Sequence, residues 1–298
     1  MKLQGMFALA ATPFDHTGAI YRTKVQHNFA KWRRTSLAGF IVGSLAGEGP
    51  LLEAAEKIEM MKLAAASVGE GGGNSAILIG DVSQEGVHGA VELARALAEA
   101  GAHAVISRAP HEYRHLPNAE EMPLLYFRAL ADQSPVPVVI QNAPVVTGID
   151  LSPATLAALA QHPNIVGVLE SGTPVSRVQE THALAGKDFA VLAGTEGQVW
   201  ESLRAGANGA ALAFASAAPY ATIAIWEAFR TREEEAAVDW QGRMAHPGLL
   251  VTDVYGAPGL KHAMDLNGYY GGPPRLPFGP IGGEGKQAIE EAFRDLKG

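Results

Sequence analysis

Short apolar runs alternate with amphipathic segments along almost the whole chain. Near-continuous apolar runs of this length are typical of parallel strands that are buried on both faces. Eight runs have this character: Met6–Ala11, Gly39–Gly43, Ala76–Gly80, Ala104–Ser107, Pro137–Ile140, Ile165–Leu169, Phe189–Ala193 and Gly209–Ala215. Segments with helical periodicity lie between them, among them Glu53–Ala66, Gly86–Ala100, Glu120–Ala131 and Pro153–Ala160. The pattern predicts an α/β fold, a (β/α)8 TIM barrel.

The chain continues beyond the last predicted strand and its helix. This part contains helical stretches and the Pro/Gly-rich segment "YYGGPPRLPFGPIGGEG". We therefore predict a barrel over residues 1–232 and a C-terminal helical extension, residues 233–298, that packs on the barrel.

Composition excludes several classes of protein. A net charge of −8 argues against a nucleic-acid surface, and we expect no nucleic-acid partner. The chain has no cysteine, which excludes disulfides, a thiol nucleophile and a thiolate metal site. Residues Gly209 to Trp226 carry no charge and approach the length of a membrane span, but Pro219 divides them. A buried strand followed by a helix with proline in its first turn explains them better, so we expect a cytoplasmic protein without a membrane segment.

Chemistry in a TIM barrel is located where the strands end and the following loops begin. The predicted strand ends carry Thr12-Pro13, "GSLAGEG", Asp81, "SRAPHEYRH", "QNAPVVTG", "LESG", "GTEG" and "ASAAP". Together with "TPF", the pair Gly47-Glu48, "NAPVVTGIDLSPATLAALAQHPNIVGV" and "GPPRLPF", these stretches resemble, in order and spacing, the dihydrodipicolinate synthase and N-acetylneuraminate lyase family of class I aldolases. The resemblance implies a barrel enzyme that forms dimers or tetramers and acts on a small oxo acid.

The same resemblance implies that the family's reaction centre has been replaced. The family's Schiff-base lysine, within "GIKE", corresponds to Leu169, and its proton-relay tyrosine corresponds to Gln141. Its two hydroxyl residues correspond to Leu45 and Ala46. The arginine of "RTG" corresponds to Val146, and the tyrosine pair after the fourth strand to His111 and Glu112.

These replacements are not conservative. Leucine has no amine with which to form an imine, and an amide fills a proton relay poorly because it is neither protonated nor deprotonated near pH 7. Lys261 lies in the C-terminal extension, where a surface or packing role is expected. We therefore predict that the protein does not act through the family's lysine Schiff base.

Polar residues nevertheless surround the predicted mouth of the barrel. We predict substrate contacts from Ser44, Gly47, Glu48, Arg108, Gln141, Asn142, Ser171 and Thr195. A structural role is open for several of them: Glu48 is expected to cap a helix or pair across a loop, and Thr195 to begin a helix. Glu170 should point away from the barrel interior, because side chains alternate from Leu169.

Arg108, His111 and Glu112 are the candidates for chemistry. Arg108 is predicted to bind a carboxylate in a bidentate way, with a surface salt bridge as the alternative. His111 and Glu112 form the predicted acid/base pair. A metal site at His111 and His115 would require a helical loop and a third ligand, so the prediction includes no metal and no cofactor.

Three hypotheses follow. The first is a lyase or aldolase-type enzyme that acts on a small oxo or hydroxy acid through groups such as His111 and Glu112, without an imine. We expect its ligand to be a small acid or sugar acid. The second is a catalytically silent homologue that binds a small molecule or a partner. The third is a metal-assisted aldolase or hydratase.

Overall fold

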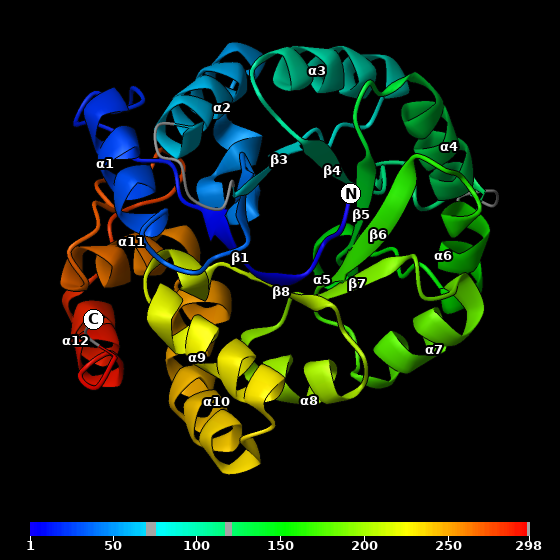
Figure 1. Cartoon of the computed structure of the whole chain (residues 1–298). Helices are drawn as coiled ribbons and strands as arrows, with labels where there is room; N and C mark the ends of the chain where they lie inside the picture. Colours follow the sequence, from blue (N-terminus) through cyan, green and yellow to red (C-terminus); the bar gives the residue numbers. More distant parts are fainter. Residues whose placement is uncertain (70–75, 117–120, 297–298) are drawn as a thin grey trace.

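The computed structural model describes residues 1–69, 76–116 and 121–296. Its strands form a closed parallel barrel in the order β1 to β8, and its helices surround the barrel (Figure 1). The strands are β1 Gly5–Ala10, β2 Gly39–Val42, β3 Ile77–Asp81, β4 Ala104–Arg108, β5 Val138–Asn142, β6 Ile165–Glu170, β7 Ala190–Ala193 and β8 Gly209–Leu212. The predicted TIM barrel is confirmed.

The helices are α1 Arg22–Trp32, α2 Ala54–Gly69, α3 Val87–Glu99, α4 Met122–Gln133, α5 Pro144–Thr147, α6 Pro153–Ala160, α7 Ser176–Ala185, α8 Val199–Arg204, α9 Pro219–Thr231, α10 Glu234–Leu249, α11 Gly256–Leu266 and α12 Gly283–Ala292. The start of the predicted helix Glu120–Ala131 lies outside the described residues, and α4 covers its remainder apart from one residue. As predicted, the uncharged stretch around Pro219 is a strand, β8, followed by a helix, α9, with proline in its first turn. In the described ranges no helix combines the length and the apolar character needed to cross a membrane.

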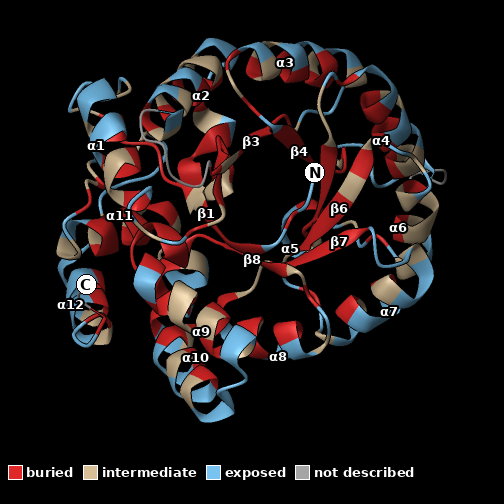
Figure 2. Cartoon of the chain, viewed as in Figure 1, coloured by how far each residue is buried: buried red, intermediate tan, exposed pale blue. Residues whose placement is uncertain are grey.

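The barrel has two hydrophobic layers, and its strands are buried on both faces (Figure 2). The interior holds a cluster that includes Phe7, Ile41, Ile106, Val139 and Leu169. The opposite faces of the strands pack against the surrounding helices. Because every strand must bury both faces, the sequence shows apolar runs instead of strict alternation.

The C-terminal helices predicted after the barrel are present as α10, α11 and α12. Side chains from this part reach the loops at the carboxyl ends of the strands. Arg275 donates to both carboxylate oxygens of Glu56 on α2, at 2.7 and 2.6 Å, and to the carbonyl oxygens of Leu51 and Gly18. These bonds hold α2 and the loops next to it in place. The division at residue 232 stays a prediction.

Glu196 lies in the η3 turn, Glu196–Gln198, where α10 packs closely against it. A Cβ atom added at Gly248 of α10 would lie 2.6 Å from the Glu196 Cβ. This packing removes water, and burial raises the pKa of the Glu196 carboxyl from 4.5 to about 7. Backbone amides, among them that of Phe214 at 3.4 Å, oppose this shift only in part.

A raised carboxyl pKa makes folding depend on pH in a defined direction. Between pH 4.5 and about 7 the folded protein binds a proton at Glu196 that the unfolded chain does not bind, so this contribution to stability is lost as pH rises through 7. We expect Glu196→Gln to raise the free energy of unfolding at pH 8 by up to about 3 kcal/mol, with a much smaller difference near pH 4.5. Thermal melts at both pH values measure this, with Glu201→Gln on the exposed face of α8 as the control. An equal effect at both pH values would show that Glu196 does not titrate in this range.

Candidate functional site

Leu169 is the last residue but one of β6 and faces the barrel interior. Its side chain is 0% exposed and belongs to the interior hydrophobic cluster. Glu170 lies on the other face of the strand, as predicted, and accepts a hydrogen bond from Asn142 Nδ2 at 2.9 Å. At the position where the resemblance expects a lysine, the barrel axis is therefore filled with packed side chains.

A cavity of about 290 Å³ opens to one side of this filled centre. The loops after β2, β3, β4 and β5 form its walls, together with the first turns of α2, so it lies at the end of the barrel where TIM-barrel enzymes carry their active sites. Its lining residues are Leu45, Pro50, Lys57, Ser83, Gln84, Glu85, Arg108, Ala109, His111 and Val146.

Arg108 and Asp81 form a buried ion pair in the wall of this cavity. β3 and β4 are adjacent, and the Arg108 Nη1 lies 3.1 Å from the Asp81 Oδ2. The two side chains are 9% and 1% exposed. Arg108 Nη1 also donates to Gln141 Oε1 at 3.4 Å, and Asp81 accepts from the Ser83 amide at 2.8 Å. The salt bridge expected for Arg108 under the alternative is thus present, but it is buried and does not lie at the surface.

Glu85 organises the loop after β4. Its carboxylate accepts the backbone amides of His111 and Glu112, at 2.9 and 3.0 Å, and lies 3.1 Å from His111 Nδ1. Possible ligand atoms of Glu85, His111 and Glu112 lie within 4.8 Å of one another. The loop forms a turn at residues 112–115 instead of a helix, and His115 is outside this cluster, so the helical spacing required for a His111–His115 metal pair is not present.

Two of the other predicted contact residues, Glu48 and Gly47, make contacts within the mouth loops. Glu48 is 1% exposed, forms an ion pair with Lys261 and accepts the Arg275 amide at 2.7 Å, so the expected pairing across a loop is confirmed. Its backbone has a φ of 57°, which these contacts hold in place. Gly47 accepts the Thr12 hydroxyl at 2.6 Å, and a Cβ there would lie 2.5 Å from the Ala10 carbonyl oxygen.

Four further predicted residues lie outside the lining of the cavity. Asn142 bonds Glu170, Asp150 and Leu151, and Thr195 accepts the Gly172 amide at 3.0 Å. Ser171 is half-buried beside Gly194, and Ser44 is buried with no hydrogen-bond partner for its hydroxyl in the described part of the chain. Their roles as substrate contacts stay predictions.

Lys57, Ser83, Gln84 and Glu85 line the cavity although the sequence did not suggest them. For Lys57 a signal existed: it occupies the buried stripe of an amphipathic helix with Met60, Met61 and Ala64. A lysine in such a stripe needs either a partner or a water-accessible space at its tip.

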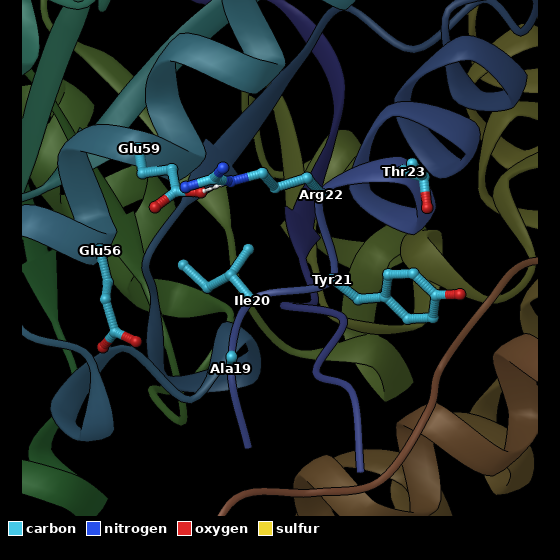
Figure 3. A pocket seen from close by; sticks show the side chains of 7 residues that line it. All are labelled: Ala19, Ile20, Tyr21, Arg22, Thr23, Glu56 and Glu59. Atoms are coloured by element: carbon cyan, nitrogen blue, oxygen red, sulfur yellow. Dashed lines mark hydrogen bonds and ion pairs between the residues drawn. The ribbon is translucent and has the colours of Figure 1, made fainter. Parts of the chain in front are cut away.

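A second recess has less to offer a charged substrate. It has a volume of about 390 Å³ and lies between the loop that leads into α1 and helix α2 (Figure 3). Its charged groups are already paired, Arg22 with Glu59 and Glu56 with Arg275, and Arg275 lowers the pKa of Glu56. The recess therefore offers few unpaired charges to a ligand.

Comparison with known proteins decides the family. The model of the Dihydrodipicolinate synthetase family matches residues 2–296. The chain belongs to this family. It is 33% identical over 245 residues to the 4-hydroxy-tetrahydrodipicolinate synthase of Stenotrophomonas maltophilia (strain R551-3), covering 82% of this chain and 80% of that protein.

Solved dihydrodipicolinate synthases share the fold. A dihydrodipicolinate synthase from Bacillus anthracis superposes with a TM-score of 0.93 at 22% identity, covering 100% of both chains. A prophage protein of the same family from E. coli K12, solved in complex with pyruvate, has a TM-score of 0.89 at 21% identity, covering 98% of both chains. The suspected resemblance is thus confirmed at the level of family and fold.

Proposed function

We propose that this member of the dihydrodipicolinate synthetase family is a lyase or aldolase-type enzyme that makes or breaks a bond in a small oxo or hydroxy acid. The reaction takes place in the cavity beside β3 and β4 and does not use a lysine on β6. One observation carries the proposal: a single cavity at the carboxyl ends of the strands is lined by both the buried Arg108 and His111. The proposal needs no cofactor and includes assembly as a dimer or tetramer in the cytoplasm.

Each group has a distinct task in this reaction. Arg108 Nη1 is held by Asp81 and Gln141, while its remaining side-chain nitrogens donate to no acceptor in the described ranges. A guanidinium held in this way presents donors to a substrate carboxylate. His111 is half-buried at the cavity edge, and Glu85 holds it, so it can exchange a proton with the substrate. Glu112 is exposed beside it and is the predicted second acid/base group.

A panel of small oxo, hydroxy and sugar acids tests this function. We expect an oxo acid to raise the melting temperature of the wild-type protein and to be turned over. Arg108→Lys should weaken the binding, because an ammonium cannot reproduce the guanidinium fork. His111→Gln should lower kcat by about 10² to 10⁴-fold while the thermal shift persists. Stabilisation without turnover would instead identify a silent binding homologue.

A metal-assisted aldolase or hydratase is the second candidate, which the cluster of Glu85, His111 and Glu112 favours. Nitrogen and carboxylate ligands suit Zn²⁺ or Mn²⁺. Under this alternative the oxo acid stabilises the protein only after Zn²⁺ or Mn²⁺ is added, and Glu112→Gln removes the effect. Stabilisation by the acid in the presence of EDTA would exclude it.

A further inference from the structure

Lys57 is a buried lysine whose side chain lines the cavity. Its side chain is 9% exposed, and its methylene groups pack along the loop after β2, where a Cβ added at Gly43 would lie 3.6 Å from the Lys57 Cγ. Helix α2 places Lys57 on its buried stripe, and Arg275 fixes the start of that helix through Glu56. The Lys57 amine therefore belongs to a helix whose first turn is held in place by Arg275.

The Lys57 amine has no hydrogen-bond or ion-pair partner among the described residues. The other buried lysine, Lys261, differs: it pairs with Glu48 and donates to the Pro273 carbonyl at 2.9 Å. Lys261 is therefore occupied in joining α11 to the mouth loops. An unpaired amine on a side chain that lines a cavity is available to a ligand.

The surroundings favour the neutral, nucleophilic form of this amine. Burial lowers the pKa of Lys57; the nearby Asp81 charge opposes this effect, and the Arg108 charge adds to it. A lysine amine becomes a nucleophile at neutral pH when it is desolvated or placed near another cation. Both conditions apply to Lys57.

We propose that Lys57 is the amine that forms an imine with a small 2-oxo acid in this cavity, in place of the missing lysine on β6. The inference rests on the cavity, the unpartnered amine and the neighbouring Arg108. It also rests on the proposed function, which it deepens by naming the residue whose imine would withdraw electrons from the substrate. Arg108 binds the carboxylate of the acid, which directs its carbonyl toward the lysine.

The reaction balances without an added oxidant or reductant. The neutral amine attacks the carbonyl carbon, and a proton moves from nitrogen to oxygen to give a carbinolamine. The oxygen then leaves as water when it takes up a second proton, and the lone pair on nitrogen forms the C=N bond. His111 and Glu85, both at the cavity, are placed to transfer these protons. The protonated imine withdraws electrons from the neighbouring carbon, as a lyase or aldolase reaction requires.

Borohydride reduction in the presence of pyruvate tests the inference, because it converts the imine to a stable secondary amine. Peptide mass spectrometry of the wild-type protein should locate the adduct on Lys57. Lys57→Arg keeps a cationic side chain but should abolish the adduct. Lys62→Arg, at an exposed position on the same helix, should leave it unchanged.

The outcomes separate this inference from the proposed function. An adduct that persists in Lys57→Arg, or that maps to another lysine, overturns the assignment. So does turnover of an oxo acid that leaves no adduct on Lys57, although the lyase function would then stand. An adduct on Lys57 without turnover of any acid in the panel supports the amine assignment and contradicts the lyase function.

Discussion

Leu169→Lys should destabilise the protein by about 3 to 5 kcal/mol and should add no pyruvate-dependent lyase activity to that of the wild-type protein. Leu169 is 0% exposed within the interior cluster, and a lysine there would place an unpaired amine among hydrophobic side chains. Its partner on the neighbouring strand β5 is Gln141, whose amide cannot relay protons. Thermal melts and an assay of pyruvate release from candidate substrates measure the two effects.

Leu169→Met, which keeps a similar volume, is the control and should lose less than about 1.5 kcal/mol. Adding Leu45→Thr, Ala46→Thr and Gln141→Tyr to Leu169→Lys should give more activity than any single change, because groups that act as one unit are strongly non-additive. Activity in Leu169→Lys alone that clearly exceeds the wild-type level would show that the mouth is still organised for chemistry at β6.

Arg108→Met should lower the free energy of unfolding by about 3 to 5 kcal/mol, because it leaves Asp81 buried without its ion-pair partner. The change should also remove the thermal shift produced by the oxo acid, since the proposed carboxylate donor is lost. Denaturant titration of the free protein and thermal shift with the ligand measure the two effects separately.

The double variant Asp81→Asn with Arg108→Gln should be more stable than Arg108→Met, because neither buried side chain then carries a charge. Arg95→Met, which removes an exposed pair with Glu92 on α3, should change stability by less than about 1 kcal/mol. Equal losses in Arg108→Met and Arg95→Met would mean that the buried pair has no special role in stability.

The barrel could be read from local pattern, because the requirement to bury both faces of a parallel strand acts on each run separately. The predicted Gly39–Gly43 and Ile165–Leu169 differ from β2 and β6 by one residue at one end. The helix over Pro153–Ala160 has the predicted bounds, with Ser152 accepting the Thr155 amide at its N-terminus. Because successive side chains of a strand point to opposite faces, the sequence also predicted that Leu169 points into the barrel and Glu170 away from it.

The cavity could not be read in this way, since its walls come from segments far apart in the sequence. Lys57 lies on α2, Glu85 after β3 and Arg108 at the end of β4, and only closure of the barrel brings them together. Polar residues at strand ends suggested a ring of substrate contacts, but a polar side chain bonds whichever partner the fold supplies. Asn142 thus bonds Glu170, while Arg108 bonds Asp81.

By itself the sequence determined the eight strands and the family, because apolar periodicity and motif spacing are properties of neighbouring residues. The tertiary structure alone decided which charged groups are paired and which amine is not. Lys261 and Lys57 both lie on helices and are both buried, yet one meets Glu48 and the other faces a cavity. That difference depends on distances between loops and helices, which the fold sets and no local pattern records.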